Sequence, residues 1–314
     1  GELRIAAASS ARFTGAHVIN GSVTLNQVGT SAVCDLIIAG TTATTFGGTG
    51  QIRASDSPNN RFYSESGSGT IVLNLPFRGA GQLGVGISTL VLNSLVDNDT
   101  AGTLLVSPGG AGTDNNSVIR QSGTGLLQIR GRIFNEQGRL EVTGTGNLDL
   151  DGCNLTGGIL ADTGAGTFIA DGQQPTLQDF TLQSGEIAMA LGGSIRAGGL
   201  VTINGAINFV GTVTSDLIVI GNGTTTFAGT GQIFLNHPAH RFYSESGSGS
   251  ITIAPGLTIR GTGQLGVGLT AITNQGLILA DLAGGLNIAG NGIGFTNEGE
   301  IRVSGAGSIS ATSG

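Results

Sequence analysis

The sequence has no lysine and no tryptophan, and charged residues make up only 11% of its 314 positions. All 13 basic residues are arginines, against 20 acidic residues, and the formal net charge is −7. A nucleic-acid partner would call for a basic stripe, and a membrane span would call for about 18 consecutive apolar residues. Neither pattern is present, so we expect neither nucleic-acid binding nor membrane insertion.

Aromatic residues and cysteines are also scarce. With 12 Phe and 2 Tyr, the core must be built mainly from Ile, Leu, Val and Ala, which favours thin layers over a thick globular core. In the coiled fold inferred below, Cys34 and Cys153 are separated by about six coils, or ~29 Å along the coil axis. A disulfide needs Cα atoms within about 7 Å. We therefore predict that these two cysteines do not pair and instead fill small buried positions.

Glycine is abundant, with 58 residues, far above the usual share of about 7%. Many of these glycines open a short unit of alternating apolar and polar residues, as in 21–25 (GSVTL), 138–142 (GRLEV) and 299–303 (GEIRV). Such alternation is typical of a half-buried strand, and the leading glycine marks a turn. No segment keeps a 3.6-residue apolar period, so we expect almost no helix.

The chain contains an internal duplication. The nine residues 61–69 (RFYSESGSG) occur again, letter for letter, as 241–249. Similarity extends on both sides and relates approximately residues 12–120 to residues 194–302. Self-similarity of this kind is the mark of repeat architectures.

Short strands that each bury one face become stable when they are wound into stacked coils of about 20 residues. We therefore predict an all-β fold, a right-handed parallel β-helix (β-solenoid) of about 15 coils, continuous over residues 1–314. The predicted hand follows that of parallel crossovers in general. The alternative is a sandwich of hairpins, which would need many more Asn-Gly and Asp-Gly turns than the sequence has.

The duplicated segment is the main candidate binding site, since it holds both tyrosines of the chain. Each copy follows an irregular stretch with a proline, 55–60 or 236–240, which predicts a loop on the side of the coil. Alternation places three side chains of each copy on the outer face: Arg61, Tyr63 and Glu65, and Arg241, Tyr243 and Glu245. They could bind a sugar or a neighbouring molecule, or form a surface ion pair beside a tyrosine that covers the loop base.

Other polar groups give weaker signals. The paired acids Asp97/Asp99 and Asp149/Asp151 have the spacing of residues on one strand face, where Asp149 and Asp151 could act as acid and base on a polysaccharide. A solvated polar face is the more common explanation. His237 and His240 have a metal-like spacing but no third ligand. We predict no metal site and no cofactor.

The two ends resemble each other, since 1–5 (GELRI) is similar to 299–303 (GEIRV). Solenoids normally cover their terminal edges with capping segments, and the sequence shows no such segment. Either the chain is part of a longer repetitive protein, or its ends pair with neighbouring copies. In the second case the contact residues would be Leu3, Ile5, Ile301, Val303 and Ile309.

Three phrases, 274–281 (NQGLILAD), 284–288 (GGLNI) and 296–305 (TNEGEIRVSG), resemble the degenerate repeats of long bacterial surface proteins. These include filamentous-haemagglutinin-like adhesins and autotransporter passengers. The resemblance implies a secreted right-handed β-helix at the cell surface.

We expect an extracellular structural solenoid without enzyme activity, whose partners are copies of itself in end-to-end stacking. The alternative is an adhesin segment that binds surface glycans. A third possibility is a polysaccharide-processing β-helix enzyme or a tailspike-like protein.

Overall fold

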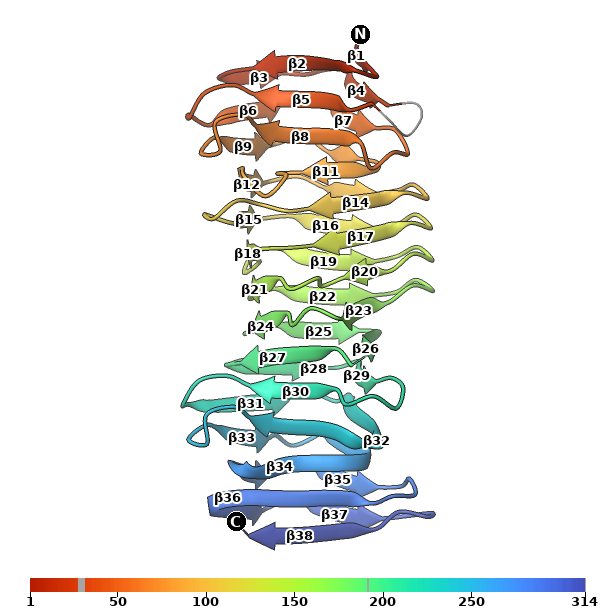
Figure 1. The fold of residues 1–314 in the computed structure, drawn as a ribbon, viewed down its shortest axis with the longest axis vertical. Coiled ribbons are helices and arrows are strands. Elements are labelled where there is room, and N and C mark those ends of the chain that lie inside the picture. Colours follow the sequence, from red (N-terminus) through yellow and green to blue (C-terminus); the bar gives the residue numbers. More distant parts are fainter. Residues whose placement is uncertain (28–31, 191, 314) are drawn as a thin grey trace. The chain divides into compact units, whose positions relative to one another are not determined.

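The computed structural model describes residues 1–27, 32–190 and 192–313, and every helix or strand assigned among them is a β-strand (Figure 1). The strands wind into a parallel β-solenoid of about 13 turns. The chain forms two compact units, Gly1–Thr167 and Phe168–Gly314, and each copy of the duplication lies in one of them. No helix among the described residues is long and apolar enough to span a bilayer. The predicted fold class is thus confirmed.

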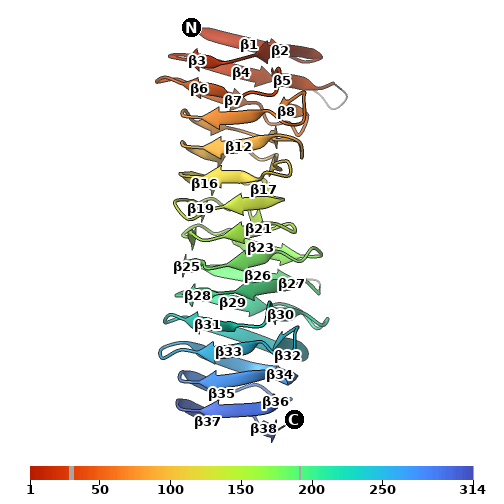
Figure 2. The ribbon, with the colours of Figure 1, turned by 90° about the vertical axis from the view of Figure 1, so that its left-hand side faces the viewer.

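Unit 1 contains three parallel sheets, and consecutive strands of the chain belong to successive sheets (Figures 1 and 2). The first sheet is β1 (Glu2–Ala6), β4 (Ser22–Asn26), β7 (Gln51–Ala54), β10 (Phe77–Arg78), β13 (Val96–Asn98), β16 (Val118–Gln121), β19 (Arg139–Val142) and β22 (Ile159–Asp162). The second sheet is β2 (Ser9–Phe13), β5 (Cys34–Ile38), β8 (Asn60–Ser64), β11 (Gly81–Leu83), β14 (Thr103–Val106), β17 (Leu126–Ile129) and β20 (Leu148–Asp149). The third sheet is β3 (Ala16–Val18), β6 (Thr44–Gly47), β9 (Thr70–Leu73), β12 (Thr89–Leu92), β15 (Thr113–Asn115), β18 (Arg132–Phe134) and β21 (Asn154–Thr156).

Unit 2 follows the same scheme, but three long strands run around corners and take part in more than one sheet. The short strands are β23 (Phe168–Asp171), β24 (Thr176–Gln178), β25 (Thr181–Ser184), β26 (Glu186–Ala190), β27 (Ser194–Gly198), β28 (Leu200–Ile203), β29 (Ala206–Phe209), β30 (Asp216–Val219), β31 (Thr224–Ala228), β33 (Ser250–Ile253), β35 (Leu277–Ala280), β37 (Glu300–Val303) and β38 (Ile309–Ser313). The long strands are β32 (Gln232–Ser244), β34 (Thr258–Asn274) and β36 (Leu286–Asn297).

The alternation of apolar and polar side chains explains why each strand turns one face toward the core. In β12 the side chains of Leu90 and Leu92 are fully buried, and those of Thr89 and Val91 are half-buried. Stacked coils place such inward residues directly over one another, so that each coil buries the apolar face of the next. Aliphatic side chains dominate the core, as predicted.

Phenylalanine contributes more to the core than its low number suggests. Phe46 and Phe62 pack edge to face in unit 1, with ring centroids 5.3 Å apart. Phe227 and Phe242 do the same in unit 2, at 4.8 Å. All four rings are fully buried. Because the pair recurs at equivalent positions of the duplication, it marks the same core layer in each unit.

The number of turns, about 13 rather than the predicted 15 or so, follows from the lengths of the loops. Glu2 pairs with Ser22 on the next coil, which gives a short coil. Ser22 pairs with Gln51, because the connections from β4 to β5 and from β5 to β6 are both longer than those of the first coil. A prediction from strand spacing alone assumed coils of about 20 residues throughout and therefore overestimated their number.

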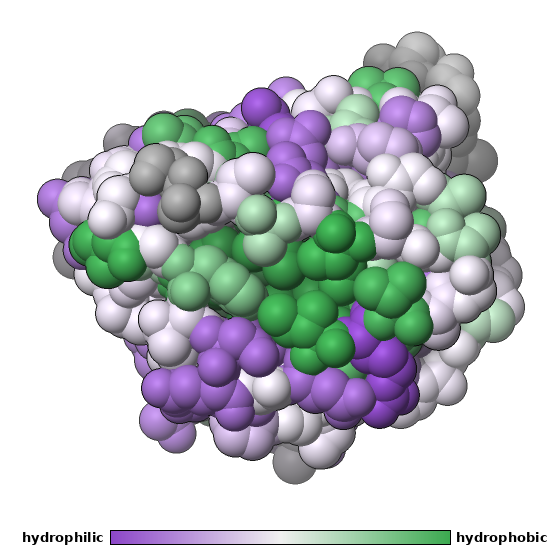
Figure 3. Space-filling model, turned by 90° about the horizontal axis from the view of Figure 1, so that it is seen from below, coloured by the Kyte–Doolittle hydropathy of each residue, from purple (hydrophilic) through white to green (hydrophobic). Residues whose placement is uncertain are grey.

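The terminal strands leave backbone edges open within each unit. In unit 1, β1, β2 and β3 pair with β4, β5 and β6, each on one side. In unit 2, β37 and β38 pair with β35 and β36. Figure 3 looks onto the end of unit 2 from below and shows an apolar centre within a polar rim. The inward side chains at the two ends are therefore in part uncovered.

Candidate functional site

A ladder of four polar side chains lies on the outer face of the second sheet of unit 1. Parallel pairing sets Ser10 beside Asp35, Asp35 beside Arg61, and Arg61 beside Gln82. Parallel register carries each of these side chains to the same face of its coil. The ladder therefore brings together residues that are far apart in sequence.

The same ladder occurs in unit 2. Its rungs, in order, are Ser194, Asp216, Arg241 and Gln264, paired as in unit 1. These residues are the counterparts, in the duplication, of the unit 1 rungs. Each unit thus presents the same chemical groups in the same order.

A bidentate ion pair forms the centre of each ladder. Arg61 donates from Nε and Nη2 to the two carboxylate oxygens of Asp35, both at 2.7 Å. Arg241 makes the same two bonds to Asp216, at 2.7 and 2.6 Å. Two parallel charge-assisted bonds fix the geometry as well as contributing energy. Each arginine is held in one orientation by its carboxylate.

Burial distinguishes these pairs from ordinary surface pairs. Asp35 is 7% exposed and Asp216 is 8% exposed, although both are on the outer face. The hydrogen bond to Asp35 raises the pKa of the Arg61 guanidinium, and Asp216 raises that of Arg241 in the same way. Both guanidinium groups therefore stay charged.

Each tyrosine lies next to its arginine. The guanidinium carbon of Arg61 is 5.3 Å from the centroid of the Tyr63 ring, and the Arg241–Tyr243 distance is 5.1 Å. Such a contact is a cation–π interaction. Burial raises the pKa of both phenols, so they are protonated at neutral pH. We call Asp35, Arg61, Tyr63 and Gln82 the unit 1 clasp, and we call Asp216, Arg241, Tyr243 and Gln264 the unit 2 clasp.

The glutamates of the predicted trios bind a second arginine. Glu65 accepts a bond from Arg12 at 3.0 Å, and Glu245 accepts one from Arg196. Each of these arginines comes from a coil two turns away. The six predicted residues therefore lie in two clusters of three, Arg61, Tyr63 and Glu65 and then Arg241, Tyr243 and Glu245, whose charged members already have partners.

The clasp glutamines hold the proline segments. Gln82 donates from Nε2 to the carbonyl of Pro58 at 3.2 Å, and Gln264 donates to the carbonyl of Pro238 at 3.3 Å. In unit 1 the proline segment is a loop beside the clasp, as predicted. In unit 2 the prediction of a loop is wrong, because Pro238 lies within the continuous strand β32, where the pairing register shifts between Asn236 and Arg241.

The residue before each clasp arginine is buried beneath the proline segment. Asn60 is buried and donates from Nδ2 to the carbonyls of Ser55, Ser57 and Ala80. Its counterpart in unit 2 is His240, which is fully buried. The Nε2 atom of His240 lies 3.2 Å from the carbonyl oxygen of Val213. Burial lowers the pKa of His240, which favours the neutral ring.

Several of these partners were not among the residues selected from the sequence. Asp35 and Asp216 begin the similar segments of the duplication, and Arg12 and Arg196 lie near its first residues. Retention of the same charged residue in both copies was the available signal. This retention does not reveal which residues are in contact, because the partners are one or two coils apart and the coil lengths vary.

The paired acids are bound by arginines or amides. Fully buried Asp97 accepts bonds from Arg78 (2.8 Å) and Arg120 (2.6 Å). Asp99 pairs with Arg53 at 3.3 Å. These contacts form a charged ladder along the first sheet of unit 1.

The second acidic pair has a different environment. Asp151 pairs with Arg130 at 2.5 Å. Asp149 accepts a bond from Gln128 at 3.2 Å and is 5% exposed. The two carboxylates are therefore engaged by neighbouring coils.

The remaining candidates for chemistry are isolated. Cys34 and Cys153 are both free and buried, as predicted, and burial raises the pKa of Cys153 to about 12. The rings of His237 and His240 lie 5.7 Å apart. Within 1–27, 32–190 and 192–313, no three His, Cys, Asp or Glu side chains gather as a metal site would require.

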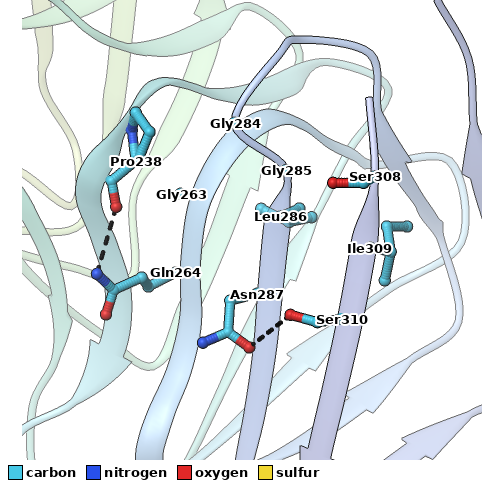
Figure 4. Close-up of a pocket in the computed structure, with 10 residues that line it drawn as sticks. All are labelled: Pro238, Gly263, Gln264, Gly284, Gly285, Leu286, Asn287, Ser308, Ile309 and Ser310. Carbon is cyan, nitrogen blue, oxygen red and sulfur yellow. Dashed lines mark hydrogen bonds between the residues drawn. The ribbon is translucent and has the colours of Figure 1, made fainter. Parts of the chain in front are cut away.

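A polar groove lies beside the unit 2 clasp (Figure 4). It has a volume of ≈ 360 Å³. Pro238 and Gln264 lie on one side, and Gly284 and Gly285 lie along its upper part in the figure. Ser308, with Ile309 and Ser310 at the start of β38, lies on the other side. No residue of this groove apart from Ile309 was selected from the sequence, because its walls come from four different strands, β32, β34, β36 and β38.

Comparison of the chain with protein-family models, with curated proteins and with solved structures finds no match.

Proposed function

We propose that this chain is an extracellular structural β-solenoid that pairs with copies of itself, so that molecules assemble end to end into a fibre or a surface stalk. The observation that carries the proposal is the pair of open, partly apolar strand edges. Leu3 is 46% exposed on β1, and Val303 is 52% exposed on β37. An uncovered edge of this kind is a template for pairing with another chain.

The inward side chains of the two edges are compatible. Leu3 and Ile5 project inward in β1, since they pair with the buried Val23 and Leu25. The inward residues of β37 are Ile301 and Val303, which pair with Ile278 and Ala280. If β37 of one molecule paired with β1 of the next, aliphatic residues would continue the core across the junction.

The candidate end residues differ in how much surface they offer. Leu3, Ile301 and Val303 are exposed, Ile309 is half-buried, and Ile5 is 4% exposed. Ile5 would therefore contribute less new buried area than the others. Burial of the three exposed side chains would supply the apolar part of the interface.

The outer faces of the two edges would bring both like and opposite charges together. Glu300 and Arg302 pair with each other on β37, and β1 carries Glu2 and Arg4 at the matching positions. In the register that aligns Leu3 with Ile301, Glu2 would lie directly beside Glu300 and Arg4 beside Arg302. These like-charge neighbours oppose stacking, and the glutamate–arginine diagonals offset part of the repulsion. On the neighbouring edges Ser310 of β38 would lie above Ser10 of β2, so the polar ladder of one copy would continue in the next.

The clasps fit a structural role. Each clasp arginine uses two donors on its own aspartate, and the associated glutamates are also paired. The ion pairs and the loop bonds connect successive coils of one unit. The acidic pairs are likewise held by arginines and amides, which supports a structural rather than an acid–base role for them.

Assembly can be tested with charged substitutions at the edges. We expect the unmodified chain to form concentration-dependent oligomers by analytical ultracentrifugation and filaments by electron microscopy. Leu3→Lys and Val303→Lys each place an ammonium group inside the proposed junction and should give monomers. Leu200→Lys is the matched control, since Leu200 is 52% exposed on β28, away from the terminal strands.

Two results would refute the proposal. One is a monomeric wild-type chain at all concentrations up to ~1 mM, which corresponds to a junction weaker than about 4 kcal/mol. The other is assembly that Leu200→Lys abolishes as effectively as the two edge variants. Circular dichroism of each variant would establish that the strands are retained.

A further inference from the structure

The two clasps are alike, but the coils that follow them differ. In unit 1 the rung after Gln82 is Leu105, and the next is Gln128. In unit 2 the rung after Gln264 is Asn287, and the next is Ser310. The ladder position that holds the aliphatic Leu105 in unit 1 therefore holds the amide Asn287 in unit 2. The polar groove of Figure 4 lies on these divergent rungs.

Two glycines shape the groove. Gly284 and Gly285 have φ values of +103° and +75°, a region that residues with a side chain rarely adopt. A Cβ atom on Gly285 would lie 2.4 Å from Oγ of Ser308, and one on Gly284 would lie 3.0 Å from Cγ of Pro238. The counterpart of Gly285 in unit 1 is Thr103. Glycine at position 285 thus allows Ser308 to lie close to the backbone, at a position where unit 1 has a threonine.

The side chains along the groove retain hydrogen-bonding capacity. Gln264 uses Nε2 on the Pro238 carbonyl, and its Oε1 atom accepts no bond from any described residue. Asn287 accepts a bond from Ser310 at 3.1 Å through Oδ1, and its Nδ2 atom makes no bond within the described chain. In Figure 4 these groups lie next to one another on adjacent strands. The groove therefore presents an acceptor, a donor and a hydroxyl in sequence.

The composition of the groove limits what it can bind. None of its ten lining residues is charged or aromatic, so an anion or a planar apolar ligand would find no complementary group. Amide and hydroxyl groups suit ligands that carry several neutral hydroxyls. The rungs repeat at ~4.8 Å, the spacing of neighbouring strands, which suits a ligand with regularly spaced hydroxyls.

We propose that the groove formed by Gln264, Asn287 and Ser310, beside Gly284–Gly285 and Pro238, binds a neutral oligosaccharide. Gln264 Oε1 accepts from one sugar hydroxyl, and Asn287 Nδ2 donates to the next. The Pro238 ring offers a small apolar surface to a sugar face. The amide groups of Gln264 and Asn287 are on the outer face of the solenoid, but Ile309 and Ser310 of the groove belong to the terminal strand β38 of the proposed junction, so binding is best measured on a chain that does not assemble.

The proposal can be tested with a panel of neutral hexasaccharides: cellohexaose, maltohexaose, laminarihexaose and mannohexaose. Hexagalacturonate serves as the acidic comparison. Binding would be measured by isothermal titration calorimetry and by saturation-transfer NMR on the Leu3→Lys chain, with the unmodified chain in parallel. We expect at least one neutral hexasaccharide to bind with a Kd below ~10 mM, and hexagalacturonate to bind more weakly.

The discriminating variant is Asn287→Leu, which installs the leucine that unit 1 has at Leu105. Asn287 is exposed, so the fold should be retained, and loss of its donor should weaken binding about tenfold. Gln128→Leu is the matched control, since it removes an amide from the corresponding ladder of unit 1. It should leave binding unchanged.

Three outcomes would overturn the proposal: no binding across the neutral panel, preferred binding of hexagalacturonate, or an equal loss of binding in Asn287→Leu and Gln128→Leu. A third variant, Gln264→Ala, removes the second sugar contact together with the bond to the Pro238 carbonyl. Its counterpart Gln82→Ala removes the loop bond in unit 1. Binding should fall in Gln264→Ala and persist in Gln82→Ala.

Discussion

The clasp aspartates lie on the outer face of the solenoid, but they are as little exposed to solvent as core residues. Asp35 is shielded by the Arg61 side chain that it binds, and the Asp216–Arg241 pair repeats this arrangement. When one partner of such a pair is removed, the other charge stays partly buried without a counterion. Its desolvation cost is then no longer compensated. The arginines are about one third exposed, and solvent screening reduces that cost.

We therefore expect Asp35→Asn to lower the free energy of unfolding by about 2 kcal/mol. Asp216→Asn should have a similar effect in unit 2. Glu65→Gln is the control, because the Glu65–Arg12 pair is well exposed and should contribute ~0.5 kcal/mol or less. Urea unfolding followed by circular dichroism would give all three values. Equal losses for Asp35→Asn and Glu65→Gln would show that burial of the clasp is unimportant.

His240 makes the stability of unit 2 depend on pH, whereas its counterpart in unit 1, Asn60, has no titratable side chain. Burial lowers the pKa of His240 in the folded chain, and the nearby His237 lowers it further, whereas the Val213 carbonyl and Asp216 raise it. The unfolded chain has a histidine pKa near ~6.5 and so binds more protons below that pH. The contribution of His240 to stability is thus complete above about pH 6.5 and is lost as the pH falls toward its folded pKa.

The pH effect can be isolated with His240→Asn, which installs the residue found at Asn60. The wild-type chain should lose stability between about pH 7 and pH 5, and His240→Asn should lose less over the same interval. His237→Asn is the matched control, since the pKa shift due to burial belongs to His240. The comparison uses urea midpoints at a series of pH values. Parallel curves for wild type and His240→Asn would contradict the assignment.

At the scale of the strand, amide side chains near the corners form hydrogen bonds between neighbouring coils. Buried Asn98 donates from Nδ2 to the Gly102 and Leu126 carbonyls and to Oε1 of Gln121. Asn93 joins an exposed ladder instead, donating to Asn74 at 2.8 Å. A buried polar group that loses its partner costs more than an exposed one, which can bond to water.

Asn98→Ala should therefore destabilise the chain by about 2–3 kcal/mol. Asn93→Ala, which removes the same group from an exposed corner, should cost ~0.5 kcal/mol. Thermal unfolding of both variants would give the comparison. Equal costs would mean that these amides act through the exposed ladder or through backbone preference, and not through buried hydrogen bonds.

The strands could be predicted because their signal is local. Alternation in 138–142 predicts β19 with Leu140 and Val142 inward, and both are fully buried. The corner-turning strands could not be predicted, since the glycines of 258–274 suggest strand ends, whereas several of them turn the chain at positive φ within the single strand β34. The contact between Asp35 and Arg61 also escaped prediction, because it depends on the length of the intervening loop.

At the scale of the whole chain, a solenoid differs from a globular domain in how stability is distributed. Each coil contacts its neighbours above and below, so stability is approximately a sum of local terms. A defect in one coil should therefore remain local. The duplication provides two equivalent positions at which this can be examined, Phe62 in unit 1 and Phe242 in unit 2.

We expect Phe62→Ala to create a cavity beside Phe46, costing about 3–5 kcal/mol locally. Hydrogen exchange followed by mass spectrometry should then show faster exchange in β5, β8 and β11 and unchanged exchange in β30–β34. Phe242→Ala, next to Phe227, should give the reverse pattern. Each variant is the control for the other, because both lose a fully buried ring. If either substitution accelerated exchange throughout both units, the chain would unfold as one cooperative body, and the nearest-neighbour account of its stability would have to be abandoned.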